Sequence, residues 1–221
     1  MNAFVKMRGV MGMQQVNLPP DVRTALENWQ ALPPEEEGKP HFFTRYVSVD
    51  VATAGLRPGV DALLSVAAVG VHQGALGDDV MAFDVPPPGA AGHDTIARHL
   101  VGLLLYLGKA PLVTYQAAFV DAFLRRAFEE HLGIDFSPAW IDLAWVLPEL
   151  FASATHGRMT LDDWLHHFDI NLPGRQEALS DALAVGRLLL AAEVEAARRG
   201  INTPKKLREI EPTRRWLGRE N

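Results

Sequence analysis

Polar and apolar residues alternate along the early part of the chain in a way that predicts three consecutive β-strands. Residues 44–51 (TRYVSVDV) alternate and are rich in β-branched residues. Residues 62–72 form a second apolar run after the turn GLRPGVD, and residues 80–85 form a third. Between the last two runs, residues 73–79 contain two glycines and an Asp pair, and we expect them to form the hairpin loop. The pattern therefore predicts a three-stranded meander.

After the meander the apolar spacing becomes mostly helical, interrupted by two short strand-like runs. We expect strands within residues 110–116 and 139–145. The expected helices follow or flank these strands, and glycines end three of them: 94–107, 117–131, a helix reaching about residue 151, 160–168 and 177–199. A meander continued by strand–helix–strand units predicts an α/β fold with a mixed five-stranded sheet flanked by helices.

The two ends of the chain differ from this middle part. Residues 1–40 are rich in proline and contain one helical pattern, at about residues 20–32, so we expect an N-terminal extension. Residues 41–200 form the main domain, and residues 201–221 are expected to form a basic tail packed on or near it. The tail's cations are expected on the surface, with phosphate contact as the alternative: Lys205, Lys206, Arg208, Arg214, Arg215 and Arg219.

Composition narrows the class of protein. The 221 residues are 48% hydrophobic and 22% charged, as in ordinary globular proteins. A net charge of −6 argues against a broad, non-specific nucleic-acid binder, which usually carries a basic face. The lack of cysteine excludes thiol chemistry, cysteine-ligated zinc and disulfides. No signal peptide or membrane-length apolar run is evident, so we expect a cytoplasmic protein with no membrane association.

Three stretches carry the candidate chemistry. They are VDVATAGL (49–56), VTYQAAFVDAFL (113–124) and RQEALSDAL (175–183). In this order they resemble the three motifs of the DnaQ-like, DEDDh-type 3′–5′ exonucleases, D-x-E-T-x-G-L, H-N-A-x-F-D-x-x-F-L and H-x-A-x-x-D-A. The resemblance extends over about residues 42–192 and implies a ribonuclease H-like fold.

In the family resembled, four carboxylates hold two Mg²⁺ or Mn²⁺ ions, and a histidine is the general base. Paired ions stabilise the entering and leaving oxygens of a phosphodiester. The first two carboxylates share a strand face because side chains alternate. Asp50 and Asp181 match two of the acids, and we expect them to form at most a weak metal site, with two solvated carboxylates as the alternative.

Other catalytic positions are replaced. Ala52 stands where the glutamate belongs, Val120 replaces an aspartate, and Gln176 replaces the histidine. Glutamine cannot take up a proton at neutral pH. Asp121 is one residue late, which on a helix rotates its side chain by about 100°, and Tyr115 with Gln116 replaces the family's His-Asn pair.

Residues that shape the family's fold and substrate site persist. The retained glycine and apolar positions are Gly55, Leu56, Ala117, Phe119, Phe123, Leu124, Ala178 and Ala182. The resemblance implies that Thr53, Gly55 and Leu56 contact a 3′-terminal nucleotide and that Phe119 stacks on a base. Turn chemistry for the first set and core packing for Phe119 are the alternatives.

We therefore expect a degenerate 3′–5′ exonuclease homologue, weakly active or inactive, that retains binding of a nucleotide or a nucleic-acid 3′ end. One alternative is an active enzyme with a rearranged site that recruits Asp121 or Glu177. Another is a non-catalytic module that binds a protein partner. The oligomeric state stays open.

The stretch LDDWLHHFD offers one more candidate. It pairs Asp162 with His166 and Asp163 with His167 at helical i, i+4 spacing. A metal site is one interpretation, and a solvated helix with ordinary Asp–His pairs is the one we expect.

Overall fold

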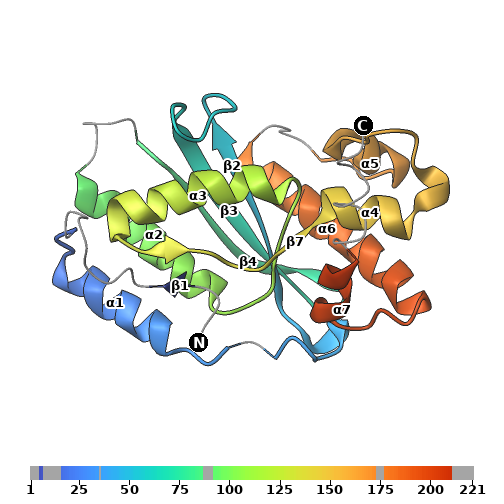
Figure 1. The fold of residues 1–221 in the computed structure, drawn as a ribbon, viewed down its shortest axis with the longest axis horizontal. Coiled ribbons are helices and arrows are strands. Elements are labelled where there is room, and N and C mark those ends of the chain that lie inside the picture. Colours follow the sequence, from blue (N-terminus) through green and yellow to red (C-terminus); the bar gives the residue numbers. More distant parts are fainter. Residues whose placement is uncertain (1–4, 7–15, 35, 87–91, 173–176, 211–221) are drawn as a thin grey trace.

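A computed structural model describes residues 5–6, 16–34, 36–86, 92–172 and 177–210 of the chain (Figure 1). Its main feature is a five-stranded sheet in the order β4-β3-β2-β5-β7. The strands are β2 (Tyr46–Thr53), β3 (Leu63–His72), β4 (Ala75–Asp84), β5 (Leu112–Thr114) and β7 (Trp140–Asp142). The first three are antiparallel neighbours, while β5 and β7 continue the sheet in parallel. The predicted mixed α/β sheet is confirmed.

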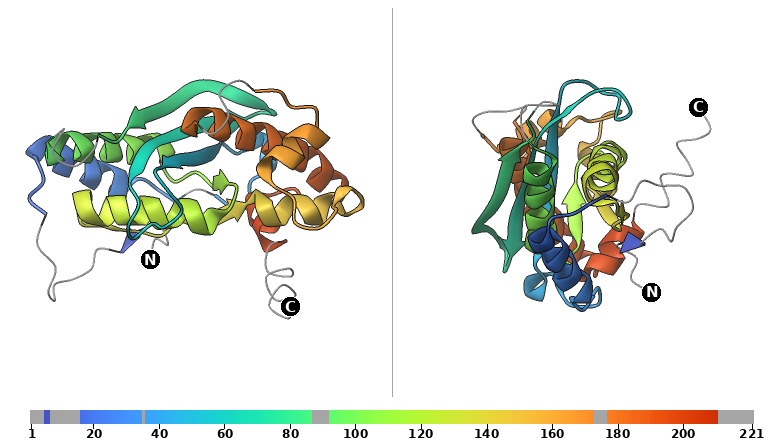
Figure 2. Two further views of the ribbon diagram at one scale, coloured as in Figure 1. Left: turned by 90° about the horizontal axis from the view of Figure 1, so that it is seen from above. Right: turned by 90° about the vertical axis from the view of Figure 1, so that its left-hand side faces the viewer.

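Helices cover both faces of this sheet (Figures 1 and 2). They are α1 (Pro20–Ala31), α2 (His93–Leu107), α3 (Ala117–Leu132), α4 (Leu143–Leu150), α5 (Leu161–His167), α6 (Ala178–Arg198) and α7 (Pro204–Glu209). Two 3₁₀ turns, η1 (His41–Phe43) and η2 (Ala152–Ala154), and a small antiparallel pair, β1 (Val5–Lys6) with β6 (Asp135–Phe136), complete the described elements. No helix of the described residues is long and apolar enough to cross a membrane.

Three apolar clusters hold the layers together. Val47, Val49 and Val51 of β2 pack with α1, α2 and α3 on one face. The long helix α6 lies against β2 and β3 on the other face, where its small residues allow close approach. Gly186 is such a residue, because an added Cβ would lie 2.6 Å from a Leu76 methyl group.

The hairpin between β3 and β4 corrects the sequence prediction. The turn is only Gln73–Gly74, with φ of 53° and 75°, and His72 pairs directly with Ala75. Positive φ at both central residues is typical of a type I′ turn, whose twist matches that of the flanking strands. The residues expected in the loop, including Gly77 and Asp79, therefore lie in β4.

The C-terminal segment forms a short helix that the sequence did not predict. In α7, Leu207 is buried and Arg208 forms an ion pair with Glu37 at 2.6 Å. The Lys206 ammonium donates to the Gly200 carbonyl, and Lys205 is exposed. Arg214, Arg215 and Arg219 lie outside the described residues.

A half-buried carboxyl on α6 predicts an unusual pH dependence of stability. Burial raises the pKa of Glu193 from 4.5 to about 7, and the nearby Tyr46 hydroxyl has a raised pKa for the same reason. The carboxyl ionises at lower pH in the unfolded chain than in the folded one, so stability is lost as pH rises from about 4.5 to about 7. Glu193→Gln is expected to stabilise the protein at about pH 8 and to change it little at about pH 4.5, as measured by urea unfolding.

The buried His41 has the opposite effect on how the stability of the protein depends on pH. Burial lowers the pKa of His41, so its contribution to stability is lost as pH falls below the ordinary histidine value. The wild type and Glu193→Gln both contain His41. The difference between their free energies of unfolding therefore reports the effect of the glutamate alone. An equal effect of Glu193→Gln at both pH values would contradict the prediction.

Candidate functional site

The site is built on the face of β2 that looks toward α6. Ser48, Asp50 and Ala52 share this face because strand side chains alternate. The Ser48 hydroxyl donates to the Ala182 carbonyl at 2.8 Å, and Ala52 packs with the cluster formed by Ala178 and Ala182. Asp50, half-buried, lies between these two contacts along the strand.

Asp181 comes from the first turn of α6, directly before Ala182. Its backbone N–H donates to the Glu177 carbonyl at 3.0 Å, which starts the helix, and its side chain is half-buried. Asp50 therefore lies toward the carboxyl end of β2, and Asp181 lies near the start of α6. Glu177 is exposed, and Gln176 lies outside the described residues.

Three residues of the second motif that differ from the family pattern, Val120, Tyr115 and Gln116, lie around the start of α3. Val120 is buried in the cluster that includes Val49 and Val51 of β2. The Tyr115 hydroxyl donates to the Met159 carbonyl at 2.7 Å, and burial raises its pKa to about 12. Gln116 adopts a left-handed conformation, with φ of 63°, at the start of α3. None of these three side chains carries a carboxylate.

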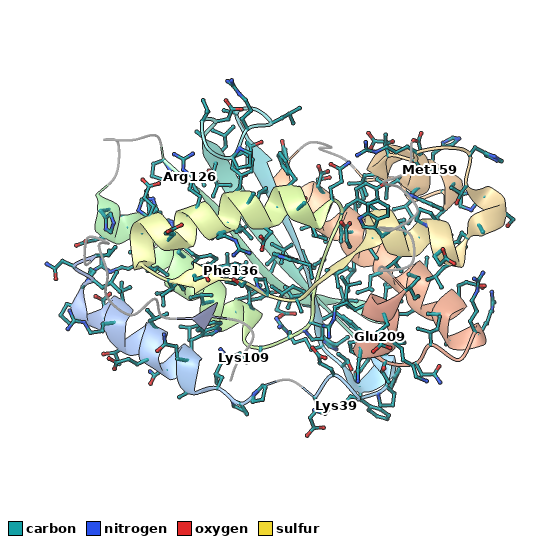
Figure 3. All side chains as sticks on the ribbon, viewed as in Figure 1. Lys39, Lys109, Arg126, Phe136, Met159 and Glu209 are labelled. Atoms are coloured by element: carbon teal, nitrogen blue, oxygen red, sulfur yellow. The ribbon has the colours of Figure 1, made fainter. Side chains whose placement is uncertain are left out.

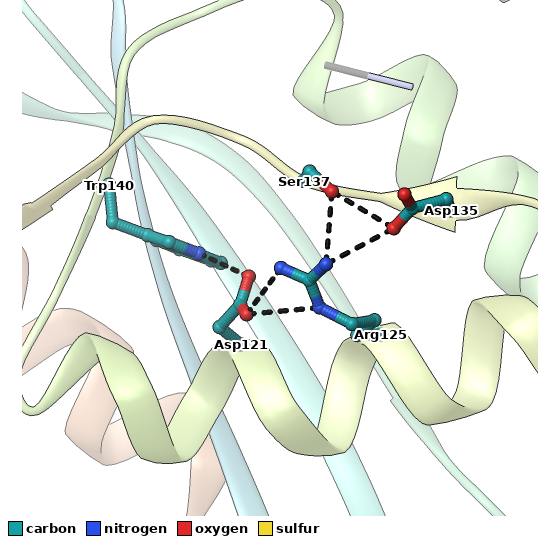
Figure 4. Close-up of polar contacts among 5 residues, drawn as sticks. All are labelled: Asp121, Arg125, Asp135, Ser137 and Trp140. Atoms are coloured by element: carbon teal, nitrogen blue, oxygen red, sulfur yellow. Dashed lines mark hydrogen bonds and ion pairs between the residues drawn. The ribbon is translucent and has the colours of Figure 1, made fainter. Parts of the chain in front are cut away.

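Asp121 is bonded to Arg125 on its own helix and to Trp140 on β7 (Figure 4). One carboxylate oxygen accepts from Arg125 at 2.8 and 3.3 Å, and the other accepts from the Trp140 indole N–H at 2.8 Å. Arg125 in turn donates to Asp135 at 3.1 Å and to Ser137 at 3.0 Å. Asp121 therefore faces the β6–β7 segment, which disfavours the alternative in which it joins Asp50.

A buried aspartate that the sequence analysis missed organises the neighbouring strand ends. The Asp142 carboxylate accepts from the backbone N–H groups of Gln116, Ala117 and Ala144 at 2.8, 2.9 and 3.0 Å. It thereby caps α4 and fixes the start of α3. An aspartate directly before an apolar helical pattern is a capping signal, but its bonds to α3 depend on the tertiary fold.

The loop after β2 contains the residues that the resemblance assigns to substrate. The Thr53 hydroxyl donates to the Gly55 carbonyl at 2.8 Å. A Cβ on Gly55 would lie 2.5 Å from the Asp61 carboxylate, which itself accepts from the Arg57 N–H at 2.8 Å. Both residues therefore shape the loop. Its tip carries Leu56, which is 82% exposed although apolar.

Helix α3 supports this loop. The Arg126 guanidinium, labelled in Figure 3, donates to the Pro58 carbonyl at 2.7 Å. Phe119 lies near the start of the same helix, with its ring centroid 5.0 Å from that of Phe123, and it is only partly buried against the core. An exposed leucine on the loop and a partly exposed phenylalanine on α3 therefore belong to segments in direct contact.

Solved structures of other proteins share the fold of this chain. No family model matches the chain, and no curated protein matches it. Solved structures do: E. coli exonuclease I with a dT13 oligonucleotide has a TM-score of 0.54 and 16% identity, over 70% of this chain and 42% of that one. This chain shares its fold with part of exonuclease I. The likeness confirms the ribonuclease H-like architecture expected from the three motifs.

Other exonuclease I structures give the same likeness. The zinc-bound form of E. coli exonuclease I with single-stranded DNA has a TM-score of 0.55 at 16% identity, over 70% of this chain and 42% of that one. A complex described as ExoI/SSB-Ct has a TM-score of 0.53 at 15% identity, over 71% and 42%. The present chain thus corresponds to less than half the length of exonuclease I.

The described carboxylates form no cluster of the kind that holds a pair of divalent ions. Within the described residues, no group of three or more His, Cys, Asp or Glu side chains could hold a metal ion. Asp50 and Asp181 are two carboxylates, and a Mg²⁺ ion bound by so few protein ligands keeps water or substrate oxygens in its other positions.

The histidine-rich helix α5 gives no metal site either. The Thr160 N–H donates to the Asp163 carboxylate at 2.7 Å, and the Asp163 N–H donates to the Thr160 hydroxyl at 3.2 Å, which forms a capping box. The bonds that Thr160 donates through its N–H and its hydroxyl lower the pKa of the Asp163 carboxyl. His156, His166 and His167 line an adjacent depression of about 630 Å³ near Met159 (Figure 3). Asp162, Asp163, His166 and His167 are exposed, in agreement with a solvated helix face, while Trp164 and Leu165 of the same helix are buried.

Proposed function

We propose that this chain is an exonuclease-fold protein that binds a nucleic-acid 3′ end or a nucleotide and hydrolyses it weakly or not at all. The proposal rests on the contacts of the side chains at positions where the family resembled has catalytic residues. Ala52 and Val120 pack against apolar neighbours, while the displaced Asp121 is bonded to Arg125 and Trp140. The strand and helices that would carry a full catalytic site are present, whereas positions 52 and 120 carry alanine and valine in place of the family's acids.

The chemistry explains why turnover should be low. Phosphodiester hydrolysis needs an activated water and stabilisation of extra negative charge. Losing a positioned general base costs about 10²- to 10⁴-fold in rate, and two carboxylates bind Mg²⁺ or Mn²⁺ only weakly. Asp50 and Asp181 would hold one such ion, which would help to neutralise a bound phosphate without activating a water.

Binding is supported by the loop after β2. Leu56 and Val60 are exposed apolar side chains on this loop, and Phe119 is a partly buried aromatic on the helix that supports it. Apolar and aromatic surfaces bind bases without reading their sequence. Bound oligonucleotides in the exonuclease I structures are consistent with such a ligand.

Single-stranded DNA with a 5′ fluorophore tests the proposal by fluorescence anisotropy. We expect Leu56→Asp to weaken binding about tenfold, because it removes an apolar contact to a base. Val194→Asp is the matched control, since Val194 is 57% exposed on the far half of α6 and should have no effect. Equal binding by both variants would contradict the proposal.

Incubating the same labelled DNA with the protein and Mn²⁺ distinguishes the alternatives. Mn²⁺-dependent loss of the 3′ nucleotide that disappears in Asp50→Asn would identify an active enzyme, with the exposed Glu177 as the remaining candidate acid. No binding of nucleotide or of single strands by the folded wild type would favour a module that binds a protein partner.

A further inference from the structure

Strand β4 forms an open edge of the sheet. It pairs with β3 and, within the described residues, with no other strand (Figure 2). The strand is ten residues long, contains no Pro, Lys or Arg, and has three aspartates and a register shift opposite residues 77–79 as its edge features. Met81 and Phe83 pack toward α2, which holds the regular part of the strand, residues 80–84, in an extended geometry.

The opposite side of β4 presents an apolar row between two carboxylates. Val80, Ala82 and Asp84 pair with Val69, Ala67 and Ser65, which places them on the sheet face covered by α6. The helix does not reach this far, because Val80 is 45% exposed and Ala82 and Asp84 are also exposed. Asp78 is exposed two residues before Val80, in the stretch where the β3–β4 register shifts.

Charge decides which kind of strand fits this edge. Asp79 is engaged by Arg45 at 2.8 Å, but no ion pair is formed by Asp78 or Asp84 among the described residues. A second copy of β4 pairing antiparallel about Met81 would set Asp78 opposite Asp84 twice, and like charges directly opposite destabilise a sheet. A basic strand would instead place cations opposite both carboxylates.

We propose that the β4 edge is a docking site for an extended basic segment of a partner protein, which adds to the sheet as a further strand. Backbone hydrogen bonds supply affinity in this mode, and alternate side chains supply specificity. The segment carries Lys or Arg at two positions six residues apart, to match Asp78 and Asp84, with apolar residues between them over Val80 and Ala82. The site is independent of the nucleotide-binding proposal.

The test uses the full chain and the labelled peptide Lys-Thr-Val-Thr-Val-Thr-Lys with blocked ends. Binding is followed by anisotropy, and chemical shifts of the β4 amides report where the peptide lies. We expect Asp78→Lys with Asp84→Lys to weaken binding at least about tenfold and to create binding of the Glu-ended peptide. Asp94→Lys with Glu27→Lys, at exposed acids on α2 and α1, is the charge-matched control and should have a much smaller effect.

Two further measurements complete the test. Peptides N-methylated on one or the other alternating set of amides should differ, because only one set pairs with the edge. Asp50→Asn should leave peptide binding unchanged. The proposal is overturned if the basic peptide does not bind at millimolar concentration, if binding ignores the double charge reversal, or if sedimentation shows a dimer that Val80→Asp dissociates.

Discussion

Supplying the side chains that the family motifs have at three positions, with Ala52→Glu, Val120→Asp and Gln176→His, is expected to raise 3′-exonuclease activity by about 10³-fold or more. Glu at position 52 would share the β2 face with Asp50, and Asp at position 120 would return the acid to its position on α3. The measurement is release of the 3′ nucleotide from 5′-labelled single-stranded DNA in Mn²⁺. The same three changes combined with Asp50→Asn should give no gain.

Val120→Asp places a carboxylate where the wild type buries a valine, so it will also lower stability. Ala52→Glu alone avoids this cost and should by itself strengthen Mn²⁺ binding. A folded triple variant that binds DNA and Mn²⁺ but gains no activity would contradict this account of the lost groups. Wild-type activity equal to that of the triple variant would contradict it too.

Asp142→Ala is expected to lower the free energy of unfolding by about 3–5 kcal/mol, because buried donors left without an acceptor each cost about 1–3 kcal/mol. Its carboxylate accepts from three backbone N–H groups, at the starts of α3 and α4, and it is 2% exposed. Urea unfolding at neutral pH measures the change. Asp142→Asn should lose roughly half as much, because its amide retains one acceptor oxygen.

Asp78→Ala is the matched surface control and should change stability by less than about 0.5 kcal/mol. A loss below about 1 kcal/mol in Asp142→Ala would mean that water or a neighbouring group replaces the carboxylate. In that case Asp142 would not be the residue that fixes the two helix starts.

Much of the site could be predicted because it depends on local periodicity. Alternation in β2 placed Asp50 and Ala52 on one face, and the packing of Ala52 and Ser48 against α6 confirms this. The one-residue displacement of Asp121 predicted a different direction for its side chain, and its bonds to Arg125 and Trp140 agree. These features follow from backbone geometry alone.

Other features needed the tertiary fold. Trp140 is 19 residues from Asp121, and nothing in either local sequence indicates their hydrogen bond. Asp142 reads locally as a helix cap, while its bonds to Gln116 and Ala117 join segments about 25 residues apart. The Gln73–Gly74 turn was missed because Gly77 and the Asp pair gave stronger loop signals than a glutamine that adopts positive φ.

Calorimetric titration of Mn²⁺ into wild type, Asp50→Asn and Ala52→Glu tests the central claim, that the fold persists while the metal site is reduced to two acids. We predict that the wild type binds weakly, with Kd of about 10⁻³ M or above, that Asp50→Asn abolishes this binding, and that Ala52→Glu tightens it about tenfold. Micromolar binding of two ions by the wild type would contradict the claim, because it would require ligands beyond Asp50 and Asp181.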